Sequence, residues 1–130
     1  MGKNINKFMS KNEKFLSSFK IAVYGLKSAF KEENNFRKQL LIAIVVIFFM
    51  IILGLNPIED AILLLTIIVV LSLELINSQI EKFLDIIHPE HHPRVKIIKD
   101  FSAGAVLLSA IGSIIIGLII FWPHIISNIK

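Results

Sequence analysis

The chain contains no cysteine, which excludes disulfide bonds, thiolate metal sites and cysteine nucleophiles. It also lacks a Walker-type Gly-x-x-x-x-Gly-Lys-Ser/Thr motif and a Gly-x-Gly-x-x-Gly motif, which excludes the soluble kinase folds that these motifs mark. No nucleophile elbow with ordered Ser, His and Asp partners is present, so nothing indicates a covalent enzyme intermediate. The lysine-interrupted N-terminal region has no apolar core beside a small-residue cleavage site, and we expect no removable signal peptide.

Hydrophobic residues are abundant instead. They make up 55% of the 130 residues, and the mean hydropathy is +0.73, which is unusually apolar for a water-soluble protein. Three long apolar stretches alternate with polar segments, and at 1.5 Å per residue the first of them crosses most of a hydrocarbon core of roughly 30 Å. We therefore predict one all-α membrane domain over residues 1–130, with spans over about 38–55, 61–85 and 100–122. The second span extends beyond the membrane.

Turn and end signals separate these spans. The break between the first two is predicted from the turn-forming and acidic residues Asn56, Pro57, Glu59 and Asp60. Trp122 lies where an interfacial aromatic residue is expected, and Pro123 is predicted to end the third helix.

The net charge of +4 is concentrated in two places. Basic residues precede the first span and return in the loop between the second and third spans, whereas the first loop carries only Glu59 and Asp60. The positive-inside rule places both basic segments in the cytoplasm. Lysines next to a membrane span indicate contact with anionic lipid, and we expect no nucleic-acid partner.

An amphipathic helix is predicted over about 12–32. Its apolar residues recur at helical spacing, while most of its lysines fall elsewhere around the helix, which is typical of a helix lying at the lipid headgroups. A lysine-rich anchor that only orients the protein is the alternative. The apolar positions are Phe15, Phe19, Ala22, Val23, Leu26 and Phe30.

Polar residues in the second span form one stripe. Inserting an isolated charged side chain such as Glu74 costs roughly 2.5 to 3.5 kcal/mol near the bilayer centre and less near the interface. The presence of Glu74 in this span therefore indicates a structural or functional role. At 100° per residue, the stripe spans a sector of about 60° on one helix face. Its members are Glu74, Asn77, Glu81 and Asp85. They form either an amphipathic helix emerging into water or an acidic site that holds Mg²⁺ together with nucleotide phosphates.

Two other segments offer polar groups at the same predicted boundary. Either Glu32 or Glu33 could add a carboxylate, and periodicity does not choose between them. The loop over 88–93 contains three histidines and Glu90, which are competent zinc ligands. The adjacent histidines between the two prolines, His91 and His92, lack the i, i+4 spacing of two ligands on one helix face, so a solvated loop or a nucleotide contact is favoured. In the third span a row of small residues predicts close helix packing, within the chain or with another: Ala105, Ser109, Ser113 and Gly117.

Four segments together resemble the prokaryotic diacylglycerol kinase family, which includes undecaprenol kinases. The two strongest are ELINSQIEKFLD at 74–85 and KDFSAGAV at 99–106, and the spacing between them matches as well. Upstream, GLKSAF at 25–30 and ENNFR at 33–37 resemble the N-terminal block of the family. The similarity covers nearly everything except the extreme termini.

The resemblance implies a homotrimeric helical bundle in the bacterial cell membrane, with its N-terminus and active site in the cytoplasm. It implies transfer of the γ-phosphoryl group of Mg-ATP to a lipid hydroxyl, with Glu74 as the catalytic base and Asn77 supporting it. By the same resemblance, Glu33 and Glu81 would hold Mg²⁺ against the nucleotide. The other implied nucleotide-binding residues are Glu90, His91, His92, Lys99 and Asp100.

Two points stay open at this level. Where better-known diacylglycerol kinases have an arginine and a tyrosine, this chain has Lys14 and Ile21, which puts contacts from that helix in doubt. Its composition, rich in lysine, asparagine and isoleucine, favours undecaprenol as the substrate over diacylglycerol. Two other functions are possible alternatives. A non-enzymatic small membrane subunit with a packing role would leave the row Glu74, Asn77 and Glu81 unexplained. An ion-coupled channel or transporter could use a membrane carboxylate, but no repeat of broken helices is visible in the sequence.

Overall fold

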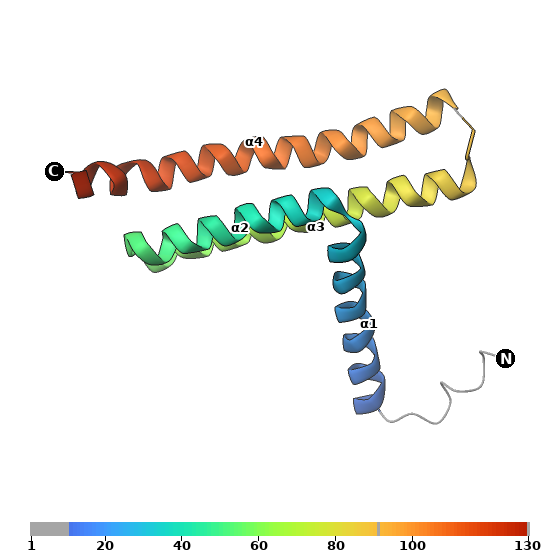
Figure 1. The fold of residues 1–130 in the computed structure, drawn as a ribbon, viewed down its shortest axis with the longest axis horizontal. Helices are drawn as coiled ribbons and strands as arrows, with labels where there is room; N and C mark the ends of the chain where they lie inside the picture. The colour runs from blue at the N-terminus through green and yellow to red at the C-terminus, as the bar shows by residue number, and fades with distance from the viewer. Residues whose placement is uncertain (1–10, 91, 130) are drawn as a thin grey trace. The chain divides into compact units, whose positions relative to one another are not determined.

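The computed structural model describes residues 11–90 and 92–129, and its regular elements over these residues are all helices (Figure 1). They are α1 (Lys11–Glu32), α2 (Asn34–Leu53), α3 (Pro57–Ile87) and α4 (Pro93–Ile129). The last three are each long and apolar enough to cross a membrane. The predicted all-α fold with an N-terminal amphipathic helix and three spans is confirmed. The chain divides between residues 34 and 35 into two compact units.

The first unit is essentially the helix α1, which agrees with the predicted helix over 12–32. Glu13 lies in its first turn and Lys31 in its last, where both charges complement the helix dipole. Large aromatic side chains along it are exposed, including Phe15 and Phe19. An exposed aromatic row on a lysine-rich helix is a surface that suits the lipid interface.

The second unit begins with α2, which ends one residue before Gly54. The backbone of Gly54 has a φ of +61°, in the left-handed region where glycine is favoured because it has no Cβ. Its N–H donates to the carbonyl oxygen of Met50 at 3.2 Å, which closes the helix end. The helix thus ends two residues before the predicted limit of the first span, and it begins four residues earlier, at Asn34.

A capping box starts α3 earlier than predicted. The side-chain oxygen of Asn56 accepts the N–H groups of Ile58 and Glu59, both at 3.0 Å, and Glu59 Oε2 accepts the N–H of Asn56 at 3.0 Å. Pro57 occupies the first helical position, where its missing N–H costs nothing. The prediction of a turn through Asp60 was therefore wrong, because these residues form a helix start.

The end of α4 also differs from the prediction. Pro123 was predicted to end the helix, but α4 continues through it to Ile129. Proline removes one backbone hydrogen bond, and membrane helices tolerate this loss where neighbouring helices support the next turn. Here His124, directly after the proline, lies with its Nε2 3.1 Å from Glu59 Oε2 of α3.

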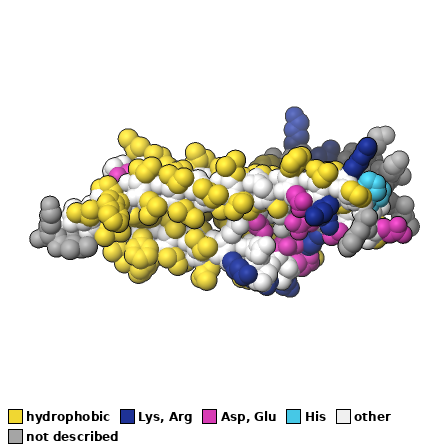
Figure 2. Space-filling model, turned by 90° about the horizontal axis from the view of Figure 1, so that it is seen from above, with side chains coloured by type: hydrophobic (Ala, Val, Ile, Leu, Met, Phe, Trp, Pro, Cys, Tyr) yellow, Lys and Arg dark blue, Asp and Glu magenta, His cyan; other side chains and the backbone are white. Residues whose placement is uncertain are grey.

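The helices α3 and α4 run antiparallel alongside each other (Figure 1). The buried core of the second unit joins all three of its helices near the α2–α3 turn, and its buried members are Met50, Leu55, Leu63 and Ile120. Hydrophobic side chains also cover much of the outer surface (Figure 2). An apolar exterior this extensive fits a bundle whose solvent is lipid.

Candidate active site

The first two members of the polar stripe of α3, Glu74 and Asn77, lie within the bundle. Glu74 is 3% exposed, Asn77 is 8% exposed and Ser78 is 5% exposed, and these are the buried polar residues of the described chain. The amide Nδ2 of Asn77 donates to Glu81 Oε1 at 3.1 Å, one helical turn further on. A simple amphipathic helix would turn these groups towards water, so Glu74 and Asn77 belong to an internal polar site.

Glu74 receives a hydrogen bond from another helix. The side-chain Nε2 of Gln39, on α2, donates to Glu74 Oε2 at 3.1 Å. Glu74 is the eighteenth residue of α3, so it lies about 26 Å along the helix from Pro57, close to the far side of a core of about 30 Å. A carboxylate at that depth combines low hydration with access to groups at the boundary.

Further towards the α3–α4 loop, an ion pair connects α3 and α4. Lys99 Nζ of α4 forms an ion pair and hydrogen bond with Asp85 Oδ1 of α3. The lysine side chain is 30% exposed and the aspartate 65% exposed. The pair lies at the solvent side of the stripe, where a lysine can exchange one anionic partner for another.

A hollow of about 570 Å³ opens beside this pair, at the α3–α4 loop. This volume falls in the range of small-molecule sites, roughly 300–1,000 Å³. The rings of His88 and His92 lie 6.0 Å apart there, and His92 Nδ1 accepts the backbone N–H of Arg94 at 3.2 Å. Its polar lining residues are Asp85, His88, Glu90, His92, Lys96 and Lys99.

The structure places the predicted site residues of the second unit in two groups along α3 and at the α3–α4 loop. Glu90, His92 and Lys99 line the hollow, while Glu74, Asn77 and Glu81 form the stripe one to several turns away on α3. Asp100 is exposed on α4 and does not line the hollow. Glu33 follows α1 in the first unit, and its N–H donates to Ala29 O at 2.8 Å. His91 lies outside the described residues.

The arrangement of the His, Asp and Glu side chains determines which kind of metal site they could form. Over residues 11–90 and 92–129, no group of three or more His, Cys, Asp or Glu side chains is arranged to hold a metal ion. Mg²⁺ does not need such a cage, because it binds through one or two carboxylates and completes its shell with phosphate oxygens and water. Glu81, held by Asn77, fits that kind of site.

Sequence reasoning missed three features. Gln39 and Ser78 were not singled out as candidate site residues, and Lys99 was not expected to pair with Asp85. An uncharged polar residue just inside an apolar run, such as Gln39, is a usable signal because it needs a partner when buried.

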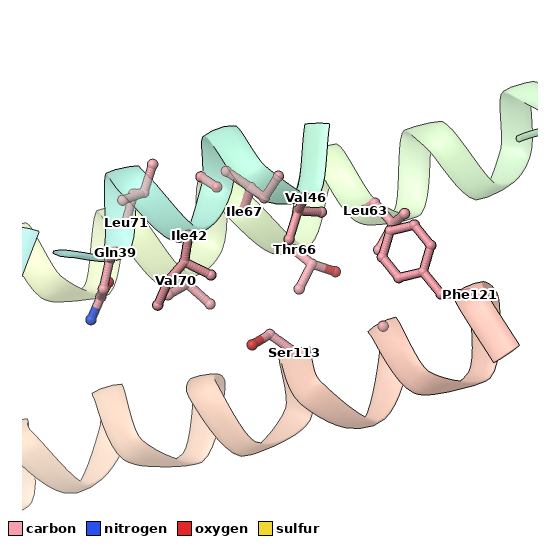
Figure 3. Close-up of a pocket in the computed structure, with 12 residues that line it drawn as sticks. Gln39, Ile42, Val46, Leu63, Thr66, Ile67, Val70, Leu71, Ser113 and Phe121 are labelled. Atoms are coloured by element: carbon pink, nitrogen blue, oxygen red, sulfur yellow. The ribbon is translucent and has the colours of Figure 1, made fainter. Parts of the chain in front are cut away.

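A second cavity of about 90 Å³ lies between the helices of the bundle, with Gln39 at one end and Phe121 at the other (Figure 3). Its walls are mostly aliphatic side chains of α2 and α3. Ser113 and Gly117, from the predicted small-residue face of α4, line its remaining side. At these two positions the small-residue face is directed towards α2 and α3 of the same chain, whereas Ala105 of the same row is exposed.

Comparisons with known proteins point to one family. A family model described as prokaryotic diacylglycerol kinase matches residues 20–121. The chain is 39% identical over 112 residues to an undecaprenol kinase of Bacillus subtilis, covering 86% of this chain and 91% of that relative. It is 38% identical over 113 residues to a diacylglycerol kinase of Synechocystis, covering 86% of this chain and 65% of the longer relative. A diacylglycerol kinase of Haemophilus influenzae is 34% identical over 108 residues, covering 82% of this chain and 92% of the relative.

Proposed function

The chain belongs to the prokaryotic diacylglycerol kinase family, and on this basis we propose that it transfers the γ-phosphoryl group of ATP to the hydroxyl group of a membrane lipid. As a member of this family it is a lipid kinase. The observation that carries the proposal is the burial of the Glu74 carboxylate on a membrane-length helix, beside the row of Asn77 and Glu81. That placement would allow a lipid alcohol and a water-soluble nucleotide to meet at one boundary of the membrane.

In the proposed reaction, Glu74 accepts the proton of the lipid hydroxyl. The alcohol oxygen forms a bond to the γ-phosphorus, the bond from that phosphorus to the bridging oxygen breaks, and ADP leaves with the electron pair. The proton held on Glu74 is then released to solvent. Because phosphoryl transfer depends mainly on positioning and on charge stabilisation, a general base contributes only part of the rate.

By the family resemblance, Glu81 and Glu33 would hold Mg²⁺, which when bound would neutralise phosphate charge and favour release of ADP. The hydrogen bond from Asn77 fixes one oxygen of Glu81, and this support favours Glu81 as a ligand. In this arrangement Asn77 acts mainly on Glu81, to which its amide donates, while Gln39 donates to Glu74.

The nucleotide would occupy the hollow beside the α3–α4 loop. Lys99 would leave Asp85 to contact the phosphates, while Glu90, His91 and His92 would lie by the base or ribose. By the family resemblance, Asp100, the residue directly after Lys99 on α4, would also contact the nucleotide. The volume of the hollow and its mixture of acidic, basic and imidazole groups support this assignment.

The enzyme would lie in the bacterial cell membrane with its N-terminus and this polar end in the cytoplasm. The lysines that precede α2 support this orientation, as do the basic residues on the ends of α3 and α4 beside their connecting loop, Lys82, Arg94, Lys96 and Lys99. The amphipathic α1 would rest at the lipid headgroups. A homotrimer is part of the proposal, because it is the assembly that the family resemblance implies.

Undecaprenol is the favoured lipid substrate and diacylglycerol the second candidate. The Bacillus subtilis relative is named an undecaprenol kinase, and the match spans nearly its whole length. Other relatives of similar identity are named diacylglycerol kinases. Both lipids present a hydroxyl group next to long apolar chains, so the same site chemistry serves either.

The test is transfer of labelled γ-phosphate from Mg-ATP to undecaprenol and to diacylglycerol, compared side by side in mixed micelles with purified protein. We expect faster transfer to undecaprenol and little ATP consumption without a lipid alcohol. Glu74→Gln keeps the shape of the residue and removes the base, so the rate should fall by about 10²–10⁴-fold. No transfer to either lipid would support a non-enzymatic membrane subunit instead.

A further inference from the structure

Gln39 makes the hydrogen bond that ties α2 to the buried stripe of α3. Gln39 lies at one end of the cavity within the bundle (Figure 3), and its Nε2 lies 3.1 Å from Glu74 Oε2. Both residues belong to the second unit, so their contact is set within one packed body. No role for Gln39 follows from the motifs of the sequence.

The hydrogen-bonding chemistry of the contact determines the orientation of the Gln39 side-chain amide. An ionised carboxylate only accepts hydrogen bonds, so the NH₂ end of Gln39 must face Glu74. A hydrogen bond to a charged carboxylate is roughly twice as strong as one between neutral groups. The bond therefore restrains the rotation of the Glu74 side chain about its last torsion.

The other end of the same amide supports a functional reason for glutamine. Gln39 Oε1 is buried and accepts no hydrogen bond from the described residues. A buried acceptor without a partner destabilises the fold, and an aliphatic residue would avoid that cost among the apolar neighbours of the cavity. Packing alone thus gives no advantage to glutamine here, whereas orientation of Glu74 does.

We propose that Gln39 is a positioning residue for phosphoryl transfer, whose amide N–H holds the Glu74 carboxylate in the orientation that accepts the proton of the lipid alcohol. The inference rests on the proposed role of Glu74 as the base. A base must lie within hydrogen-bond reach of the proton it removes, and small misplacements reduce the rate strongly.

The first variant is Gln39→Met, which keeps the length of the side chain and removes the donor. We expect kcat to fall about ten- to a hundredfold, with the KM for ATP unchanged because Gln39 does not line the nucleotide hollow. Thr66→Val is the matched control. Thr66 lines the same cavity, and its hydroxyl donates to Ile62 O of its own helix at 2.7 Å, so kcat should stay within about twofold.

Non-additivity then tests whether Gln39 acts through Glu74. In the Glu74→Gln background no carboxylate remains to be oriented, so adding Gln39→Met should lower the residual rate no further. Equal fold-losses in the two backgrounds would overturn the proposal. If Gln39→Met does not fold, Gln39→Asn draws the amide back from Glu74 while keeping its polarity, and wild-type kcat in that variant would overturn it as well.

The activity of the wild-type protein distinguishes a failure of this inference from a failure of the proposed function. An active wild type whose Gln39→Met variant matches Thr66→Val in kcat would overturn only the positioning role. A wild type that transfers no phosphate to either lipid would overturn the proposed function itself.

Discussion

The side-chain amide of Asn77 donates to Glu81 Oε1 at 3.1 Å, one turn along the same helix. The family resemblance suggests that Asn77 supports Glu74, which lies one turn in the opposite direction. The observed bond links Asn77 to the proposed metal ligand instead. Its function should therefore be visible in the metal dependence of the reaction.

We expect Asn77→Leu to raise the Mg²⁺ concentration needed for half-maximal activity by about ten- to a hundredfold, because a ligand loses the group that orients it. The rate at saturating Mg²⁺ should fall much less. Magnesium titrations of the kinase rate measure both quantities, and Ser78→Ala, at the neighbouring buried position, is the control. A collapse of kcat with unchanged Mg²⁺ dependence would instead support a role on Glu74.

The ion pair between Lys99 and Asp85 leads to a prediction about nucleotide binding. If Lys99 moves to the phosphates, Lys99→Gln should raise the KM for ATP about 10- to 100-fold through loss of a charge-assisted contact. Asp85→Asn should leave the KM unchanged or lower it, because the lysine no longer has to leave a partner. Lys96→Gln removes the same charge from the same hollow, and an equal effect in that control would indicate general attraction of the anion.

The contact between Glu59 and His124 should affect stability and not chemistry. It joins the start of α3 to the turn after Pro123, far along α3 from Glu74. Replacing the carboxylate with Glu59→Gln or the imidazole with His124→Leu should lower the free energy of unfolding, because each change removes one partner of the contact. Unfolding in mixed micelles measures the loss, and a double-mutant cycle tests whether the two losses share one interaction. A large fall in kcat for a fully folded variant would contradict this assignment.

Gly54 should resist substitution for backbone reasons alone. Its φ is +61° and nothing lies within 4 Å of the position that a Cβ would occupy, so Gly54→Ala meets strain without a clash. We expect a loss of about 1–2 kcal/mol of unfolding free energy. Gly25→Ala is the matched control, since Gly25 lies inside α1 with equally open space, and alanine should be neutral or stabilising there. Equal effects at both positions would show that the left-handed turn is not the cause.

The fold class and the polar stripe could be predicted from the sequence. The lengths of the apolar stretches imply helices that cross a membrane, because every backbone group in lipid must find a partner within its own segment or a closed sheet. Helical periodicity also places Glu74, Asn77 and Glu81 on one face. The capping box at Asn56 was readable too, as an Asn followed three residues later by Glu59, although we had predicted a turn.

The pairs that join different helices were decided by the tertiary structure. Gln39 and Glu74 are 35 residues apart, and Glu59 and His124 are 65 residues apart. Local periodicity determines the face on which a residue lies, but its partner depends on the register and rotation of the neighbouring helix. Register and rotation are determined by packing around Met50, Leu63 and Ile120. Because that packing is the sum of many small contacts, no single sequence motif predicts it.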